Sequence, residues 1–138
     1  MKRGDVLYFH DWEFPDGGHA NKLLIVMNDP KTGMVAMLIT TSQDKGRRKR
    51  NPGCQPTQRE YFLPKTPYWN KGSWISFRRR VEVWHTSQVQ GALDDNKCKI
   101  VTTLPEQTIN EIKNCMKKCC IDDLPRDVCE LLGLKYDG

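Results

Sequence analysis

Residues 22–42 read KLLIVMNDPKTGMVAMLITTS and contain two apolar runs, Leu23 to Met27 and Met34 to Ile39. Turn-forming residues make up the connection at 28–33: Asn and Asp bond to their own backbone, Pro fixes φ, and Gly permits positive φ. Runs that are apolar at nearly every position are typical of strands covered on both faces. The stretch therefore predicts a buried antiparallel hairpin around which the rest of the chain folds.

The two ends of this predicted hairpin carry polar side chains. His19 and Lys22 precede the first run, and the second run ends in Thr40, Thr41 and Ser42. Because the start of one antiparallel strand lies beside the end of the next, we expect Lys22 near the hydroxyl cluster. Side chains alternate along a strand, so only one of Thr40 and Thr41 can face the same way as Lys22. An ammonium group beside hydroxyls suits a bound phosphate.

The charge of the chain points to nucleic acid as a partner. The 138 residues are enough for a single domain with an adequate core, and the formal net charge is +5. Clustered Lys and Arg supply most of the nonspecific affinity for phosphates. The candidate RNA contacts are Arg47, Arg48, Lys49, Arg50, Arg78, Arg79 and Arg80, with Trp69 as a base-stacking residue.

No apolar stretch approaches the length of a membrane span, and the N-terminus lacks the apolar core of a secretory signal. We therefore expect a cytoplasmic protein without membrane contact, in which thiols stay reduced. The six cysteines are Cys54, Cys98, Cys115, Cys119, Cys120 and Cys129. Cys115 and Cys119 lie one helical turn apart, but no CxxC pair and no His accompany them. The sequence thus favours small hydrophobic side chains on a packed helix over a metal site, and we expect no cofactor.

Further strands are predicted where β-branched and aromatic residues gather, at residues 6–9, 59–63, 73–77, 81–85 and 99–102. The strands at 73–77 and 81–85 are alternatively one bent strand through the three arginines. Loops are predicted at 10–21 and, rich in basic residues, at 43–58.

Two helices are expected near the C-terminus. Thr103 and Glu106 fit a capping box, and Ile109, Ile112 and Met116 keep a helical period on one face. A second helix at 124–132 has Asp123 as its expected N-cap and Gly133 after its last residue. Strands followed by helices predict one α+β domain, mainly β. In it, residues 1–103 form a small curled barrel and residues 104–138 a helical extension.

Several segments resemble the PemK/MazF/Kid toxins. Gly4-Asp5-Val6 opens a first strand as in that family, residues 21–26 (NKLLIV) resemble its second strand, and residues 35–42 (VAMLITTS) resemble its third. Residues 63–64 (LP) and 70–75 (NKGSWI) are similar to the segment that leads into its fifth strand. The resemblance covers roughly residues 1–115. It implies an SH3-like curled barrel of five to seven short strands with one or two C-terminal helices, and a homodimer with a cognate antitoxin.

The resemblance also implies an activity, the metal-independent cleavage of single-stranded RNA by attack of a 2′-OH on the adjacent phosphate. Lys22 and Thr41 are then the candidates for the phosphate, and His19 is the candidate for proton transfer, with Asp11, Glu13 and Asp16 as alternatives.

The chain departs from the family pattern at two places. Lys22 stands where the family usually has Arg, and Lys lacks the planar fork that grips a phosphate. Phe77-Arg78 stands where the family has an acid–amide pair. Two alternatives therefore stay open: a non-catalytic SH3-like module that binds RNA or a protein, and a toxin that traps a DNA topoisomerase through its C-terminal helix, as the related CcdB group does.

Overall fold

The computed structural model describes residues 1–41, 52–63, 73–120 and 123–134. Within these residues it contains eight strands, three α-helices and two 3₁₀ helices. The strands are β1 (Asp5–Glu13), β2 (His19–Val26), β3 (Met34–Ile39), β4 (Gly53–Gln55), β5 (Glu60–Leu63), β6 (Ser73–Ser76), β7 (Glu82–His85) and β8 (Cys98–Thr103). The α-helices are α1 (Thr86–Asp94), α2 (Glu106–Cys120) and α3 (Arg126–Leu132), and the 3₁₀ helices are η1 (Pro30–Thr32) and η2 (Pro56–Gln58).

The predicted central hairpin is confirmed. β2 and β3 pair antiparallel, with Leu24 opposite Ile39 and Ile25 opposite Leu38. Asn28 closes the hairpin from inside: its side-chain oxygen accepts the Ala36 N–H at 2.8 Å, and its amide nitrogen donates to the Met34 carbonyl at 2.9 Å. The buried amide thus satisfies backbone groups that the turn leaves unpaired.

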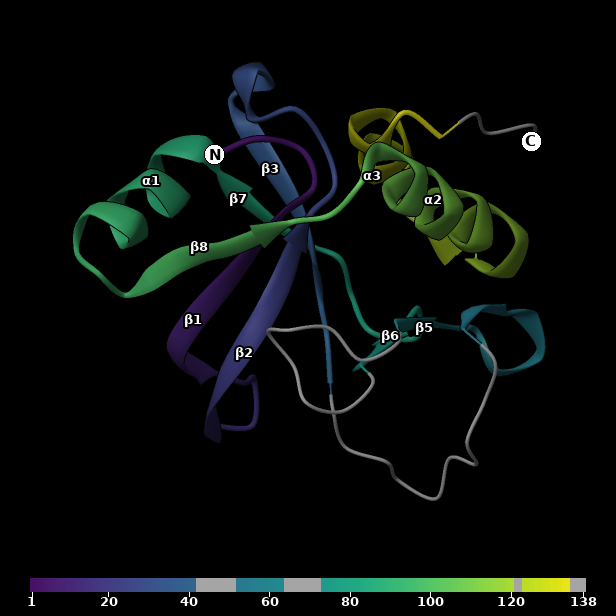
Figure 1. The fold of residues 1–138 in the computed structure, drawn as a ribbon, viewed down its shortest axis with the longest axis horizontal. Coiled ribbons are helices and arrows are strands. Elements are labelled where there is room, and N and C mark those ends of the chain that lie inside the picture. The colour runs from purple at the N-terminus through teal and green to yellow at the C-terminus, as the bar shows by residue number, and fades with distance from the viewer. Residues whose placement is uncertain (42–51, 64–72, 121–122, 135–138) are drawn as a thin grey trace.

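The strands form two antiparallel sheets rather than one. A five-stranded sheet has the order β7-β3-β2-β1-β8, and a three-stranded sheet has the order β4-β5-β6 (Figure 1). Within the described part of the chain, a single isolated bridge joins them, in which Thr41 and Trp74 exchange backbone hydrogen bonds of 2.9 and 2.8 Å. The α+β class with mainly strands is confirmed, and no closed barrel is identified among the described strands.

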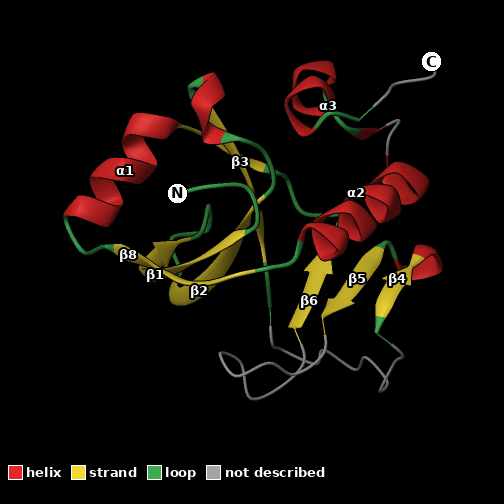
Figure 2. Ribbon diagram, turned by 45° about the horizontal axis from the view of Figure 1, so that its top comes forward, coloured by secondary structure: helices red, strands yellow, loops and turns green. Residues whose placement is uncertain are grey.

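Helices cover the five-stranded sheet on both faces. Figure 2 shows α1 on one side of this sheet and α2 on the other, where α2 also lies over the three-stranded sheet. Ile109, Ile112 and Met116 of α2 are buried, at 0%, 0% and 1% exposure, in a cluster that contains Ile25 and Leu38. Their predicted packing on the sheet is therefore confirmed.

The opposite face of the same sheet is packed against α1. Leu24 and Ile39 belong there to a second cluster, together with Val89 of α1 and Cys98 of β8. Alternate residues of β2 and β3 thus enter two different cores, which explains why these strands are apolar at nearly every position.

The predicted loop at 10–21 is wrong over most of its length. β1 continues to Glu13 and β2 begins at His19, so only a short tip separates them. A bulge between Phe9 and Trp12, where Asp11 has a φ of 57°, shifts the register by one residue. The strand was not predicted because the bulge interrupts the alternation of apolar and polar residues that indicates a strand.

Several other expectations about elements are also wrong. β4 and η2 occupy residues 53–58 of the predicted loop at 43–58, and residues 43–51 lie outside the described residues. The segments at 73–77 and 81–85 are not one bent strand, because β6 and β7 belong to different sheets. The helix α1 was not predicted; His85 is its N-cap, and the His85 N–H donates to the Gln88 side chain at 2.8 Å.

Both helix N-caps predicted for the C-terminal part are wrong. Thr103 ends β8, and its hydroxyl donates to Asp5 at 2.6 Å, while Glu106 pairs with Arg3. A long-range partner therefore competes successfully with the local capping box at each of these two residues. Asp123 pairs with Arg59 rather than capping α3. The end of α3 is as expected, because Gly133 has the left-handed φ of 69°.

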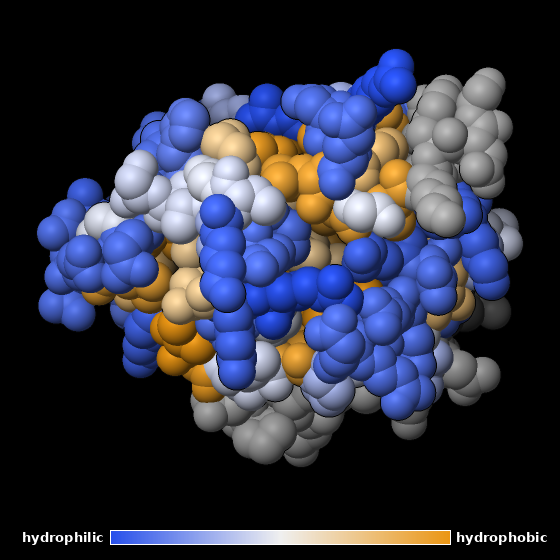
Figure 3. Space-filling model, turned by 90° about the horizontal axis from the view of Figure 1, so that it is seen from above, coloured by the Kyte–Doolittle hydropathy of each residue, from blue (hydrophilic) through white to orange (hydrophobic). Residues whose placement is uncertain are grey.

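Seen from above, hydrophilic side chains cover much of the described surface, and apolar areas lie in the upper middle and at the lower left of the view (Figure 3). Of the large hydrophobic side chains in the described residues, Val83 and Ile100 are exposed, at 36% and 44%. No helix in the described ranges is both long enough and apolar enough to cross a membrane.

Candidate functional site

The structure places the strand ends that carry Lys22 and Thr41 side by side. The Thr40 N–H and hydroxyl both donate to the Leu23 carbonyl, at 3.0 and 2.9 Å, and so extend the pairing of β2 with β3 by one residue. By strand alternation, Lys22 and Thr41 belong to the face that carries Leu24. Thr41 is therefore the threonine that shares a face with Lys22, and the hydroxyl of Thr40 is occupied by its bond to the backbone.

Lys22 lies beside a cavity that aromatic side chains help to line. Its ammonium nitrogen is 5.7 Å from the centre of the Phe14 ring, a cation–π distance. Phe14 lines a cavity of about 330 Å³, here called the Phe14 cavity. Its lining residues are Trp12, Phe14, Pro15, Ile39, Arg79, Arg80 and Glu82.

The charges at the Phe14 cavity are mainly positive. Arg79 and Arg80 are exposed in the connection between β6 and β7, and both line the cavity that Lys22 adjoins. Among the described residues of the lining, Glu82 is the only acidic one, with 21% of its side chain exposed and one carboxylate oxygen 3.9 Å from the Arg80 guanidinium. The cavity thus combines a net positive field with aromatic surfaces, which suits an anionic ligand that carries a ring.

A second hollow adjoins the Phe14 cavity and has the opposite charge. It measures about 570 Å³, lies between α1 and the strands β1 and β7, and shares Trp12 and Glu82 with the first. We call it the α1 groove. Its charged lining residues are Asp11, Glu13, Glu82, Asp95 and Lys97. Four carboxylates against one lysine make this hollow unfavourable for phosphate.

Two stacked tryptophans lie in this region: Trp12 lines both hollows, and Trp84 lines the α1 groove. The rings of Trp12 and Trp84 have centroids 5.4 Å apart and planes only 14° apart. Phe9 makes edge contacts with both. All three rings are held by strands rather than loops; Phe9 is buried, and the half-buried rings of Trp12 and Trp84 are the ones held in place for a ligand.

His19 does not join Lys22 and Thr41. In the strand register His19 lies opposite Glu13, at the far end of the β1–β2 hairpin. By alternation, its side chain belongs to the face opposite that of Lys22. Its ring nitrogen Nδ1 lies 3.1 Å from the Asp11 carboxylate, with both side chains well exposed. The structure therefore separates the predicted proton-transfer residue from the predicted phosphate site.

The predicted RNA-binding residues divide into two groups. Arg47, Arg48, Lys49, Arg50 and Trp69 lie outside the described residues. Arg78, Arg79 and Arg80 are exposed, and all three line a hollow of about 540 Å³ next to the start of α3, whereas only Arg79 and Arg80 also line the Phe14 cavity. There Arg59 pairs with Asp123 at 3.1 Å. Arg79 and Arg80 thus connect two cavities with cationic rims.

Two features of possible function were missed from the sequence. The first is Glu82, whose place in the cavity depends on the pairing of β7 with β3. The second is a disulfide between Cys54 and Cys115, with Cys119 next to it. The expectation of reduced thiols is therefore wrong for Cys54 and Cys115. A pairing across 61 residues joins two elements, β4 and α2, whose contact depends on the fold and leaves no local signal.

The remaining free thiols whose pKa is shifted are unreactive by environment. Burial raises the pKa of Cys98 to about 11, and burial is also the main reason that the pKa values of Cys119 and Cys129 are raised. Because the thiolate is the nucleophile, these thiols are poor catalytic candidates at neutral pH.

Comparison with known protein families finds none whose model matches this chain, and a search of curated proteins finds no match. The resemblance to the PemK/MazF/Kid toxins therefore rests on the short segments at 4–6, 21–26, 35–42, 63–64 and 70–75.

Proposed function

We propose that the protein is a toxin-like endoribonuclease of a type II toxin–antitoxin system, which binds single-stranded RNA in the Phe14 cavity and cleaves it without a metal ion. One observation carries the proposal: the strand ends of Lys22 and Thr41 meet beside a cavity lined by aromatic rings and by Arg79 and Arg80. Cations for phosphates and rings for bases are the two elements of single-strand recognition.

The proposed reaction is an internal displacement at phosphorus. The 2′ oxygen forms a bond to the adjacent phosphorus, and the bond from phosphorus to the 5′ oxygen breaks, which leaves a 2′,3′-cyclic phosphate. The Lys22 ammonium stabilises the negative charge that grows on the phosphorane oxygens, with the Thr41 hydroxyl as a second donor. Phe14 and Trp12 stack on a base next to the cut.

The 2′-OH must lose a proton and the 5′ oxygen must gain one. We assign the first transfer to Glu82 rather than His19, because Glu82 lines the cavity and His19 belongs to the opposite face of β2. A carboxylate can act as a general base when it reaches the hydroxyl in the bound complex. The 5′ oxygen is then protonated by solvent or by an acid that the substrate brings into reach.

The proposal also includes what the family resemblance implies about the barrel, the cellular location and the partners. In it, the two sheets joined at Thr41 and Trp74 form an opened version of an SH3-like barrel. The protein acts in the cytoplasm as a homodimer, and a cognate antitoxin protein covers the cationic rim. The exposed arginines of the β6–β7 connection are a suitable contact for an acidic antitoxin segment.

A second candidate function is a non-catalytic module that binds RNA through the same cavity. The position of His19 favours it, because no histidine of the described residues lies with Lys22 and Thr41. Phe77-Arg78 in place of the acid–amide pair of the family also favours it.

Incubation of the purified protein with single-stranded RNA in EDTA, followed both as binding and as cleavage, tests the proposal. We expect cleavage to 2′,3′-cyclic phosphate ends, a loss of about 100- to 1000-fold in rate for Lys22→Ala, and activity in Lys22→Arg. Lys31→Ala is the matched control, since Lys31 is an exposed lysine in the turn at the other end of the β2–β3 hairpin.

Two results would contradict parts of the proposal. Binding that depends on Lys22 without any cleavage selects the non-catalytic module. Absence of RNA binding, or equal loss in Lys22→Ala and Lys31→Ala, removes the Phe14 cavity from consideration as the site.

A further inference from the structure

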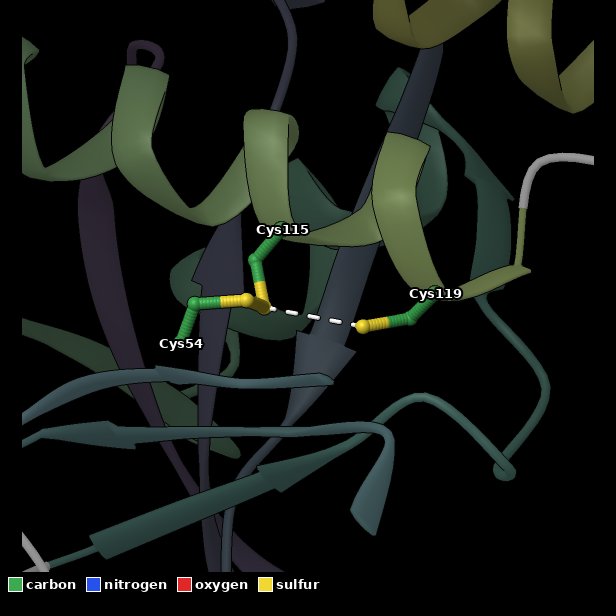
Figure 4. Close-up of side chains that lie close together, drawn as sticks. All are labelled: Cys54, Cys115 and Cys119. Carbon is green, nitrogen blue, oxygen red and sulfur yellow. Dashed lines mark hydrogen bonds between the residues drawn. A yellow bond between two sulfur atoms is a disulfide. The ribbon is translucent and has the colours of Figure 1, made fainter. Parts of the chain in front are cut away.

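Three cysteines come together where β4 meets α2, on the side of the five-stranded sheet that α2 covers. Cys54 belongs to β4, and Cys115 and Cys119 belong to successive turns of α2. All three sulfur atoms lie within 4.8 Å of one another. Figure 4 shows the Cys119 side chain pointing toward the Cys54–Cys115 disulfide, and the Cys115 and Cys119 sulfurs are 3.8 Å apart. We call this group the cysteine cluster.

The spacing of these sulfur atoms fits a thiolate metal site. Two thiolates on one tetrahedral Zn²⁺, each at about 2.3 Å, are about 3.8 Å apart. The Cys115–Cys119 separation has this value with the helix undistorted. Two cysteines at i and i+4 share one helix face, and β4 brings a third sulfur to the same point. The helix turn and β4 together thus hold three sulfur ligands in place before an ion binds.

The surroundings of the cysteine cluster leave room for a fourth ligand. Cys115 is 1% exposed, while Cys54 and Cys119 are half-buried. A hollow of about 250 Å³ opens beside Cys54 and Cys115, with Tyr61, Glu111 and Lys118 in its lining. An ion can enter from this side, and a water molecule can complete four coordination there.

Cations near Cys119 reduce the cost of forming its thiolate, although burial outweighs them. Burial raises the pKa of Cys119, while the nearby cations Arg59 and Lys118 lower it. The cations partly offset the cost of ionising a half-buried thiol, and a bound dication offsets it further.

We propose that reduction of the Cys54–Cys115 disulfide converts the cysteine cluster into a three-thiolate site for a thiophilic divalent cation, with Zn²⁺ as the natural occupant. A dithiol reductant supplies two electrons and two protons: the disulfide becomes two thiols, and the reductant becomes a disulfide. The cation then displaces the protons of Cys54, Cys115 and Cys119, which go to solvent. The two states exclude each other, because sulfurs bonded to one another are not thiolate ligands.

Both states hold β4 against α2, by a covalent bond in one and through the ion in the other. A protein that meets a reducing compartment would thus keep the contact between its three-stranded sheet and α2. The proposal is independent of the proposed RNA cleavage, which runs at the Phe14 cavity and in the presence of EDTA.

The test uses the full chain, reduced with a dithiol, freed of it without oxygen, and titrated with Co²⁺. We expect one ion per chain, with thiolate-to-cobalt charge-transfer absorption and the visible bands of tetrahedral Co²⁺, both lost on addition of Zn²⁺. Cys119→Ser should weaken binding at least tenfold and reduce the charge-transfer band. This variant keeps the disulfide cysteines, so its folding can be checked in the oxidised form.

Cys98→Ala and Cys129→Ala are the matched controls, since both residues are buried cysteines outside the cysteine cluster. We expect their spectra to equal that of the reduced parent protein, and the oxidised parent to bind no Co²⁺. The proposal is overturned if the reduced parent shows no thiolate–cobalt band. It is equally overturned if the band survives both Cys119→Ser and Cys54→Ser at full intensity.

Discussion

The two faces of the five-stranded sheet are covered in different ways. On one face, α2 places Ile109, Ile112 and Met116 in a closed core, which the three-stranded sheet and α3 complete. On the other face, α1 contributes a single fully buried side chain, Val89. Trp12, Phe14 and Trp84 therefore stay partly exposed there and border the Phe14 cavity and the α1 groove.

This difference separates stability from binding within one sheet. A face that is fully packed has no space for a ligand, and a face that keeps aromatic rings half-exposed gives up part of its burial energy. Because strand alternation directs neighbouring residues of β2 to opposite faces, Leu24 and Ile25 enter the two different cores at adjacent positions. Substitutions on the two faces should accordingly affect different measurements.

The largest expected effect is on the closed face. Ile112→Ala removes a side chain with 0% exposure, and we expect a loss of about 2–5 kcal/mol in the free energy of unfolding. Val89→Ala on the α1 face should cost less, because two carbon atoms are lost rather than three and the neighbouring hollow allows rearrangement. Urea unfolding of both variants measures the difference. Equal losses would show that the two faces contribute alike.

The Cys54–Cys115 disulfide also stabilises the closed face. It joins residues 61 positions apart, and the chain-entropy relation gives about 4 kcal/mol for closing such a loop. We expect Cys54→Ser to lose about this much in the free energy of unfolding when measured with EDTA present. Cys119→Ser keeps the bond and should lose less than about 1 kcal/mol. A Cys54→Ser protein as stable as the parent would show that β4 is held by packing alone.

The sequence predicts those parts of the fold that depend on local patterns. The β2–β3 hairpin and the helix α2 are evident from apolar runs and from the spacing of Ile109, Ile112 and Met116. The end of α3 at Gly133 is evident for the same reason, since a left-handed residue is a local requirement.

What the sequence does not predict depends on long-range partners. Thr103 satisfies a local capping pattern, but the fold gives its hydroxyl to Asp5, which lies 98 positions away. The Cys54–Cys115 bond and the place of Glu82 in the Phe14 cavity follow from which strands and helices meet. The closeness of Lys22 and Thr41 was predictable because hairpin geometry fixes it, whereas His19 lies three residues away on the other face.

The open face is tested by comparing its two hollows. Phe14 lines only the cationic cavity and Trp84 only the acidic groove. Since stacking of one base on an aromatic ring contributes about 1–3 kcal/mol, Phe14→Ala should weaken binding of single-stranded RNA by this amount. Trp84→Ala should have a clearly smaller effect. Fluorescence anisotropy with a labelled RNA measures both, and the reverse order would assign the α1 groove to RNA.

The smallest expected effect is a difference in how the two faces respond to high pH. Burial raises the pKa of Cys98, on the α1 face, from 9.0 to about 11. Burial and a hydrogen bond to Glu111 raise the pKa of Tyr61, on the α2 face, from 10.0 to about 12. In both cases the folded state favours the protonated form. The stabilisation is therefore complete below the unfolded-state pKa and is lost as the pH rises toward the folded-state pKa.

The contribution of Cys98 should consequently be lost between about pH 9 and pH 11, and the contribution of Tyr61 between about pH 10 and pH 12. While a single group titrates only in the unfolded state, the free energy of unfolding falls by about 1.4 kcal/mol per pH unit. Cys98→Ala should reduce the decline that begins near pH 9, to which Cys119 and Cys129 also contribute because their pKa values are raised, and Tyr61→Phe should reduce the decline that begins near pH 10. Urea unfolding at a series of pH values measures both. If Cys98→Ala leaves the decline near pH 9 unchanged, ionisation of this thiol does not limit the stability of the α1 face.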